Sequence, residues 1–304
     1  MRVVVTGATG LIGSALVDAL RERGDVPVAL ARSTESARAK LGEAVEVHPW
    51  VAPEEDPPPA QALAGAGGVV HLLGEPVDQR WSDEAKRRIR DSRVRSTTLL
   101  ADALTALSPE ERPAVLVSQS ATGYYGVRGD EPLSEDAAPG DDFLAGVVAE
   151  WEAAAQRAEP ALRVVRTRTG VVLSGGGGAL AKMLPFFKLG IGGPVAGGRQ
   201  YVPWIHLDDV VAGLLRCLDD EQLSGPVNLT APNPVTNAEL SRTLGRVLHR
   251  PAFLPVPGLA LKLLYGEMAQ VVTTGSRVVP ERLQAVGHRF HHPDLEPALR
   301  AALA

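Results

Sequence analysis

Three glycines near the N-terminus have the spacing of a loop that binds a phosphate group. Gly7, Gly10 and Gly13 follow a valine-rich run and open a helical pattern. In such a loop the first glycine permits a tight turn, the second lets main-chain amides approach a pyrophosphate, and the third allows a helix to pack closely on a strand. The helix N-terminus adds a partial positive charge. We favour this over a glycine turn without a ligand and predict that a dinucleotide contacts Gly7, Thr9, Gly10, Leu11, Ile12 and Gly13.

The residue nineteen positions after Gly13 selects between the two nicotinamide dinucleotides. An NAD site usually carries Asp or Glu there, which accepts hydrogen bonds from the ribose hydroxyls. This chain has Arg32, whose guanidinium would attract the 2′-phosphate of NADP and offers no acceptor to an unphosphorylated ribose. The sequence therefore predicts NADP(H) as the cofactor. The alternative is that Arg32 is an ordinary solvated residue at a strand end.

Valine-rich runs alternate with amphipathic helical patterns through the first two thirds of the chain. This order predicts an α/β fold with a doubly wound parallel sheet. The predicted strands are residues 2–6, 26–31, 68–73, 114–119, 163–167 and 226–229. The predicted helices are residues 11–23, 82–106, 143–158 and 208–218. The proline-dense, acidic segment 52–60 is predicted to be a surface connection.

The last third of the chain predicts a smaller, mostly helical domain on the substrate side of the sheet. Two glycine clusters, 175–178 and 190–198, have the backbone freedom of loops that flank a site. Helical periodicity then covers residues 237–249, 257–270, 280–286 and 294–303. We predict a nucleotide-binding domain of residues 1–174 plus about 203–228. The smaller domain would take about 175–202 and 229–304.

Composition and charge exclude several classes of protein. Hydrophobic residues make up 45% of the 304 residues and charged residues 22%, which is ordinary globular usage rather than that of a disordered chain. The net charge of -5 supplies no global attraction to nucleic acid or anionic lipid. Cys217 is the single cysteine, and we read no secretory leader or membrane-length apolar run. We expect a cytoplasmic monomer or homodimer with a small-molecule substrate and without nucleic-acid or membrane partners.

Motifs along the whole chain resemble those of extended short-chain dehydrogenases/reductases, and more closely an uncharacterised epimerase-like subgroup. They are Arg80-Trp81, Ser118-Gln-Ser-Ala-Thr-Gly-Tyr-Tyr-Gly126, Trp151-Glu152, Arg168-Thr-Gly-Val-Val-Leu173 and Trp204-Ile-His-Leu-Asp-Asp209. The resemblance implies a Rossmann-type sheet with a small C-terminal domain. It also implies that the end of the third predicted strand, the two residues after it and one further arginine help to hold the dinucleotide, namely Leu72, Leu73, Gly74, Glu75 and Arg80.

The same resemblance implies a tyrosine that exchanges a proton, a lysine four residues later, and a serine that polarises the substrate carbonyl. Ser120 fits the serine position. Phe143 and Val147 stand where the tyrosine and lysine belong, and neither can ionise, so the usual proton relay cannot run there. The asparagine often found in the preceding helix is replaced by Arg93. Either another side chain has taken over, or the pocket binds without turnover.

Several side chains are candidates for the missing proton exchange. Tyr124 and Tyr125 follow Ser120, Tyr201 lies on a segment next to glycines, and His206 carries a group that titrates near neutrality. We predict Ser120 and Tyr124 as the catalytic residues. The alternatives are that the tyrosines only pack with satisfied hydroxyls and that His206 only orients a strand–helix junction.

Other charged side chains have structural interpretations. The basic run 86–95 spreads around a helix and is interrupted by acidic residues, which favours a solvated helix over a polyanion site. Arg166 and Arg168 either meet an anionic substrate or lie at the surface. His71 is predicted to be a satisfied strand residue. No metal site is predicted, because zinc-site spacing is absent from His288, His291 and His292.

We therefore predict an NADP(H)-binding oxidoreductase or epimerase-like protein that acts on a small carbonyl or nucleotide-sugar-like substrate. The alternative is a catalytically inert NADP(H)-binding sensor or regulatory protein, which the residues at 143 and 147 would explain. The sequence names neither the substrate nor the direction of a reaction.

Overall fold

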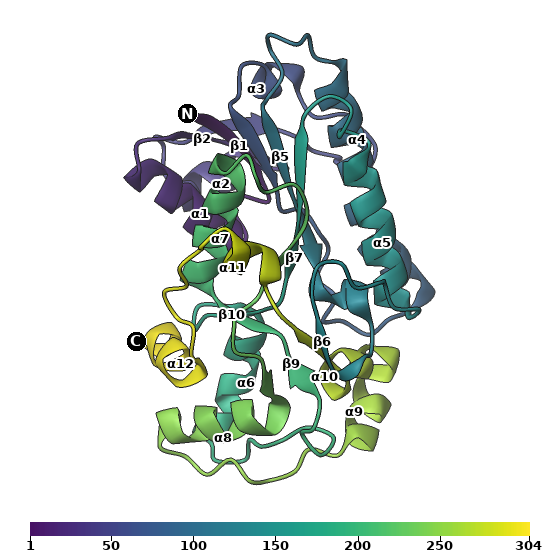
Figure 1. Cartoon of the computed structure of the whole chain (residues 1–304), viewed down its shortest axis with the longest axis vertical. Helices are drawn as coiled ribbons and strands as arrows, with labels where there is room; N and C mark the ends of the chain where they lie inside the picture. Colours follow the sequence, from purple (N-terminus) through teal and green to yellow (C-terminus); the bar gives the residue numbers. More distant parts are fainter.

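The computed structural model describes residues 1–304 and contains a seven-stranded parallel sheet (Figure 1). Its strands are β1 (Arg2–Thr6), β2 (Val26–Ala31), β3 (Glu46–Pro49), β4 (Gly68–His71), β5 (Val115–Ala121), β7 (Arg163–Thr169) and β11 (Gly225–Leu229). The spatial order is β11-β7-β5-β4-β1-β2-β3, so the direction of the winding reverses between β1 and β4. In such a sheet a crevice opens at the carboxyl ends of the strands at this reversal. The predicted α/β fold with a doubly wound parallel sheet is confirmed.

Helices cover both faces of the sheet, because neighbouring residues of a strand point to opposite faces. In β1, Val3 and Val5 pack in one hydrophobic cluster and Val4 packs in another. The first cluster includes side chains of α1 and α7, and the second includes side chains of α4 and α5 (Figure 1). These helices are α1 (Leu11–Glu22), α4 (Asp83–Ala106), α5 (Phe143–Gln156) and α7 (Leu207–Asp219).

A smaller, mostly helical region packs below the carboxyl edge of the sheet in Figure 1. Its helices are α6 (Gly178–Lys188), α8 (Asn237–Leu248), α9 (Gly258–Tyr265), α10 (Gln270–Thr273) and α12 (Leu295–Leu303), with the 3-10 turn η2 (Gly266–Ala269). Helix α11 (Glu281–Ala285) instead packs beside β11 of the large sheet. Short strand pairs join it to the sheet: β8 (Val171–Leu173) with β10 (Trp204–His206), β9 (Tyr201–Val202) with β12 (Val235–Thr236), and β6 (Gly129–Leu133) with β13 (Ser276–Val278). Trp204 is buried in the hydrophobic cluster that holds α6, α8 and α12 together.

The structure corrects several boundaries predicted from the sequence. Strand β3 and helices α2 (Thr34–Leu41), α3 (Ala60–Leu63) and α6 were not predicted. Strand β3 has four residues and a proline, and α6 follows the glycine cluster and contains Pro185, so neither has a clear periodic signal. The helix predicted at 257–270 is broken at Gly266, whose φ of 64° ends α9. The segment 52–59 has no helix or strand, as predicted, and the two-domain division stays a prediction.

None of the helices is long and apolar enough to cross a lipid bilayer.

Candidate functional site

The loop between β1 and α1 requires glycine at two of its three predicted positions. Gly7 has a φ of 65°, and a side chain there would also lie 2.8 Å from the carbonyl oxygen of Leu72. A side chain at Gly13 would overlap the carbonyl oxygen of Gly7. Gly10 donates its N–H to that same oxygen at 2.9 Å, which closes the turn. The main chain of α1 can therefore lie directly against the end of β1.

The first turn of α1 presents main-chain N–H groups that nothing in the chain accepts. Gly10 is the N-cap residue and has no side-chain oxygen to bond to the next amides. No backbone or side-chain acceptor of the protein bonds to the N–H groups of Leu11, Ile12 and Gly13. Unpaired donors at a helix N-terminus attract anions. The loop thus has the donors and the space next to Gly10 that a pyrophosphate needs.

The end of β4 lies beside this loop, because β4 pairs directly with β1. The strand ends at His71, so Leu72, Leu73, Gly74 and Glu75 follow it rather than belonging to it. The N–H of Leu72 donates to the Thr6 hydroxyl at 3.1 Å, which fixes the segment against β1. The structure brings these predicted cofactor residues to the same edge of the sheet as the glycine loop.

Arg32 directly follows β2, on the other side of β1. Its side chain is exposed and has no acidic partner, and the next residue, Ser33, caps α2 by accepting a bond from the Ser36 N–H at 3.2 Å. Arg32 is therefore free to bind a phosphate. Arg80 is exposed in the loop before α4 and lies beside Gly266 of η2.

A buried ionic network lies at the carboxyl ends of β5 and β7. The Arg168 guanidinium donates to both carboxylate oxygens of Glu152, from Nε at 2.7 Å and from Nη2 at 2.9 Å. The Ser120 hydroxyl donates to the same carboxylate at 2.7 Å. Burial alone would lower the pKa of Arg168, but its bonds to Glu152 raise the pKa above its ordinary value. Because the hydroxyl hydrogen of Ser120 is used in the bond to Glu152, Ser120 can only accept a hydrogen bond from a ligand in this arrangement.

The two tyrosines after Ser120 have different environments in η1 (Thr122–Tyr125). Tyr125 is fully buried, its hydroxyl donates to Asn228 at 2.6 Å, and it accepts a bond from Arg168 at 3.0 Å. Burial raises the pKa of Tyr125 to about 12, so the packing interpretation applies to this residue. Tyr124 is partly exposed, its ring lies 3.5 Å under the Arg168 guanidinium, and no residue of the chain hydrogen-bonds to its hydroxyl.

The positions of the missing tyrosine and lysine are occupied by packed apolar side chains. The Phe143 ring meets the Trp81 ring edge-on, with centroids 5.1 Å apart, and Lys86 lies 5.2 Å from the Phe143 centroid. Val147 is 4% exposed. Tyr124 lies close by, since η1 packs against the first half of α5. Tyr124 thus provides a phenol hydroxyl on the element next to Phe143, which itself has no group that can exchange a proton.

Three arginines for which the sequence suggested a surface position are withdrawn from solvent, Arg93 in part and Arg166 and Arg168 almost completely. Arg93 stacks on Trp151, 5.2 Å from the ring centroid, next to Gly74, and burial lowers its pKa to about 10. It is therefore not part of the solvated face of α4, whereas Arg88 and Arg90 are, through ion pairs with Glu84, Asp91 and Glu150. Arg166 is 8% exposed and Arg168 2% exposed, so the surface interpretation is wrong for both.

The histidines have structural partners. Both ring nitrogens of His71 are hydrogen-bonded, one to the Thr6 hydroxyl at 2.8 Å and the other to the Thr97 hydroxyl at 2.9 Å. The prediction that His71 is a strand residue with satisfied hydrogen bonds is confirmed. His206 caps α7, because its Nδ1 accepts the Asp208 N–H at 3.2 Å, as the junction interpretation predicted. The structure also places His292 next to Asp208, with ligand atoms of the three residues within 4.8 Å of one another.

Sequence reasoning assigned no role to two buried carboxylates of this site. Glu152 holds Ser120 and Arg168 together, and Glu135 accepts the N–H of Asn228 at 2.9 Å while burial raises its pKa. The signal for Glu152 is an acidic residue on the inward face of α5, where Val148, Trp151 and Ala155 are buried. Glu135 lies in a loop with no periodicity, so no comparable signal exists.

The strand order, the glycine loop and the free amides together define a nucleotide-binding α/β fold of the Rossmann type. Comparisons with known proteins agree. The NAD dependent epimerase/dehydratase family matches residues 3–229, and a domain of unknown function, DUF1731, matches residues 256–302. The chain belongs to the NAD dependent epimerase/dehydratase family.

Similar proteins cover the chain from end to end. The Epimerase family protein SDR39U1 homolog, chloroplastic, of Arabidopsis thaliana is 42% identical over 303 residues, which are 100% of this chain and 87% of that protein. The Epimerase family protein SDR39U1 of Homo sapiens is 35% identical over 309 residues, with 100% of both chains covered. The crystal structure of human SDR39U1 (isoform2) with NADPH matches with a TM-score of 0.89 at 34% identity and covers 100% of this chain and 99% of that one. The NADPH in that structure agrees with the cofactor predicted from Arg32.

Proposed function

We propose that this protein binds NADP(H) at the carboxyl edge of β1, β2 and β4 and acts as an oxidoreductase or epimerase on a small carbonyl or nucleotide-sugar-like substrate. The main support for cofactor binding is that the main-chain N–H groups of Leu11, Ile12 and Gly13 have no acceptor within the chain. The NADPH bound by the similar human protein supports the same cofactor. The cytoplasmic location stays a prediction, since the Arabidopsis relative is described as chloroplastic.

Each part of the cofactor has a matching group in the chain. The amides of the glycine loop would hold the pyrophosphate, and Arg32 would bind the 2′-phosphate through paired charged hydrogen bonds. The segment from Leu72 to Glu75 would line the ribosides. When bound, NADP(H) supplies the hydride, and the protein supplies its position and the proton.

Tyr124 is our candidate for the group that moves this proton. Its hydroxyl is free, and its ring is fixed under Arg168 beside α5, next to the position where Phe143 cannot ionise. Ser120 would accept a hydrogen bond from a substrate hydroxyl, and would have to turn away from Glu152 in order to polarise a carbonyl. The Glu152–Arg168 pair holds both side chains in place.

Single-turnover kinetics test the reaction. The protein with NADPH is mixed with a panel of carbonyl compounds and nucleotide sugars, and the NADPH absorbance is followed. We expect Tyr124→Phe and Ser120→Ala to abolish the signal while NADPH still raises the melting temperature of both variants. Tyr265→Phe, at an exposed tyrosine outside the site, is the matched control. Full turnover by both site variants would remove Ser120 and Tyr124 from the mechanism.

A catalytically inert NADP(H) sensor is the second candidate function. The packing of Phe143 on Trp81 and the burial of Val147 favour it, because neither of these side chains can exchange a proton. This candidate predicts NADPH-dependent thermal stabilisation and no hydride transfer to any member of the panel. A single observed hydride transfer rules it out.

A further inference from the structure

The basic residues of this acidic chain are concentrated in two segments. The whole chain has a net charge of -5, yet segments 178–202 and 233–265 together carry seven Lys and Arg side chains and one acidic side chain, Glu239. Lys182 pairs with Asp78 and Arg246 with Glu296, and the other five cations have no acidic partner. These five are Lys188, Arg199, Arg242, Arg250 and Lys262.

The two segments lie side by side in the fold. Val195 and Val256 form a parallel β-bridge, and the Arg250 Nε donates to the carbonyl of Lys188 at 3.0 Å. Helices α6 and α8 pack on each other, and α8 and α9 form the end of the molecule opposite α3 (Figure 1). We call the surface formed by segments 178–202 and 233–265 the basic end.

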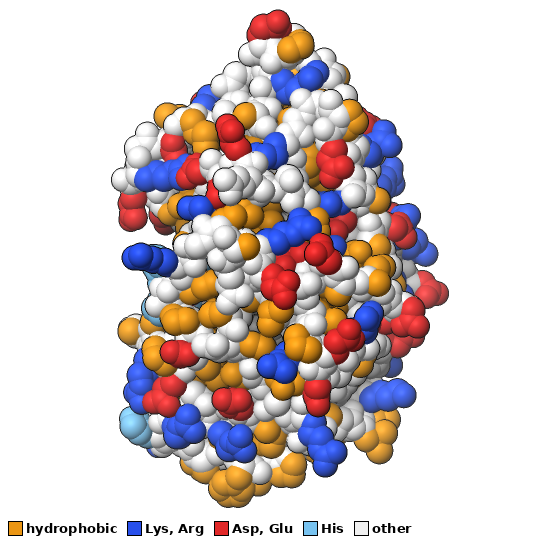
Figure 2. All heavy atoms as spheres, in the orientation of Figure 1, with side chains coloured by type: hydrophobic (Ala, Val, Ile, Leu, Met, Phe, Trp, Pro, Cys, Tyr) orange, Lys and Arg blue, Asp and Glu red, His pale blue; other side chains and the backbone are white.

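The basic end also carries most of the exposed apolar side chains. Of the fifteen large hydrophobic side chains that are exposed, nine belong to these two segments, and α9 has no buried residue at all. They are Phe186, Leu189, Ile191, Phe253, Leu254, Leu259, Leu263, Leu264 and Tyr265. Figure 2 shows hydrophobic side chains gathered at the lower end of the molecule, with basic side chains next to them. Monomeric proteins rarely leave such a concentration exposed without a binding role.

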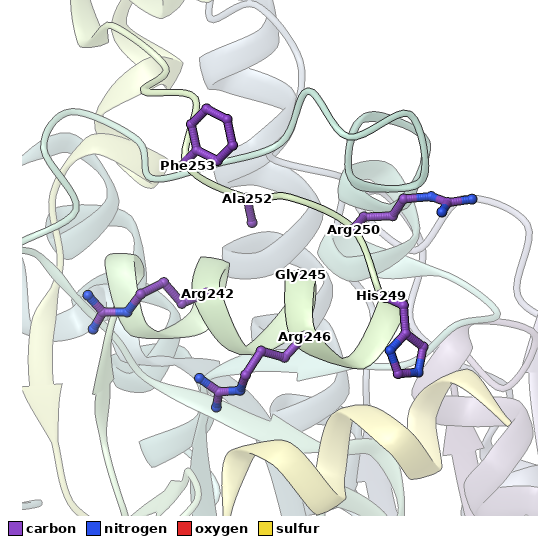
Figure 3. Close-up of a pocket in the computed structure, with 7 residues that line it drawn as sticks. All are labelled: Arg242, Gly245, Arg246, His249, Arg250, Ala252 and Phe253. Carbon is purple, nitrogen blue, oxygen red and sulfur yellow. The ribbon is translucent and has the colours of Figure 1, made fainter.

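An open groove of about 730 Å³ joins the charges to the apolar side chains. Arg242 and Arg246 line it from α8, His249 lines it from the end of that helix, and the segment with Arg250 and Phe253 runs along its other side (Figure 3). Guanidinium groups bind phosphate through paired, charge-assisted hydrogen bonds. The groove therefore has the chemistry of a phosphate site that opens next to an apolar surface.

We propose that the basic end docks on an anionic lipid surface. Leucine and phenylalanine side chains of α9 and its neighbouring loops enter the interface, while the arginines of the groove bind headgroup phosphates. A second copy of the chain fits less well, because a two-fold contact would bring two positively charged surfaces together. Nucleic acid would use the arginines but gains nothing from exposed aliphatic side chains. The proposal replaces the sequence prediction that a membrane is not a partner.

Vesicle co-sedimentation of the full-length protein tests this proposal. The vesicles contain equal parts of phosphatidylcholine and phosphatidylglycerol, or phosphatidylcholine alone. We expect binding to the anionic vesicles only, and weaker binding as salt is added. The double variants Arg242→Glu/Arg250→Glu and Leu259→Ser/Leu263→Ser should each lower the partition coefficient by roughly tenfold or more. Arg21→Glu and Val51→Ser, at exposed positions elsewhere, are the matched controls and should bind as the unchanged protein does.

Thermal unfolding of each variant, with and without NADPH, shows that it is folded. Three results would overturn the proposal. One is no binding to anionic vesicles at low salt, and another is equal binding by the basic-end variants and the controls. The third is a concentration-dependent dimer, seen by light scattering without lipid, that Leu259→Ser/Leu263→Ser dissociates, since this identifies a second copy as the occupant. None of these results depends on turnover or on the cofactor assignment.

Discussion

Two regions meet at the carboxyl edge of the sheet, and they satisfy their polar groups in opposite ways. In the β1–α1 loop, the amides of Leu11, Ile12 and Gly13 point outward without partners. At the ends of β5 and β7, Ser120 and Arg168 are both bound to the Glu152 carboxylate. Unpaired donors need a ligand, whereas a closed ionic network forms a rigid frame. We therefore expect cofactor binding to depend on the backbone, and we expect any reaction to depend on the side chains that this frame leaves free, of which Tyr124 is the first candidate.

The largest effect is expected from breaking the closed network. Glu152→Ala leaves the guanidinium of Arg168 buried without its carboxylate, which should lower the free energy of unfolding by about 3–5 kcal/mol. Urea denaturation measures this change. Asp102→Ala, which breaks an exposed ion pair with Arg157, is the control and should cost at most about 1 kcal/mol. Equal losses in the two variants would show that the network is not the frame we describe.

Acid should destabilise the protein through His71, which lies between the two regions. Burial lowers its pKa to about 3 in the folded state, while the unfolded chain takes up the proton near its ordinary value of 6.5. The stability that neutral His71 contributes is thus complete above pH 6.5 and is lost as the pH falls towards 3. At about pH 4.5 the loss should be about 2–3 kcal/mol relative to neutral pH.

Urea denaturation of the unchanged protein and of His71→Gln at both pH values isolates this contribution. The variant lacks the titrating ring. Between neutral pH and about pH 4.5, its free energy of unfolding should therefore fall by about 2–3 kcal/mol less than that of the unchanged protein. The same fall in both proteins would assign the acid sensitivity to other groups, with His288 as the next candidate because burial lowers its pKa.

A smaller loss is expected at the open loop. Gly13→Ala places a methyl group on the carbonyl oxygen of Gly7, which should cost about 1–3 kcal/mol of stability and displace the amides that we expect to bind the cofactor. NADPH calorimetry and urea denaturation should both show the loss. Gly146→Ala in α5 meets no neighbour and should raise stability slightly. Unchanged NADPH affinity in Gly13→Ala would mean that the loop does not position the cofactor.

Much of the cofactor region could be predicted from the sequence because its signals are local. The spacing of Gly7, Gly10 and Gly13 acts within one turn, and Arg32 follows a strand of regular valine pattern. Strand β3 escaped prediction because an edge strand of four residues needs no apolar run. Arg93 was placed in solvent because charge patterning cannot show that a guanidinium stacks on Trp151 from another helix.

The reaction region depends on contacts between distant segments, which no short pattern records. Arg168 reaches Glu152 across 16 positions, and Tyr125 reaches Asn228 across 103. The sequence drew attention to Ser120 and to the unusual Phe143 and Val147, but it could not show that the Ser120 hydroxyl donates its hydrogen bond to Glu152. The different roles of Tyr124 and Tyr125 also could not be assigned from the sequence, because the two residues differ in burial, which only the fold shows.

Calorimetric titration with NADPH and NADH measures the cofactor preference on which the proposed function rests. We predict that the unchanged protein binds NADPH more tightly than NADH, and that Arg32→Glu weakens NADPH by roughly 1–3 kcal/mol more than NADH. Urea denaturation of the variant should be unchanged, because the Arg32 side chain is exposed and unpaired. No heat with either dinucleotide at millimolar concentration would show that the glycine loop does not bind a dinucleotide, and equal losses for both in the variant would show that Arg32 does not bind the 2′-phosphate.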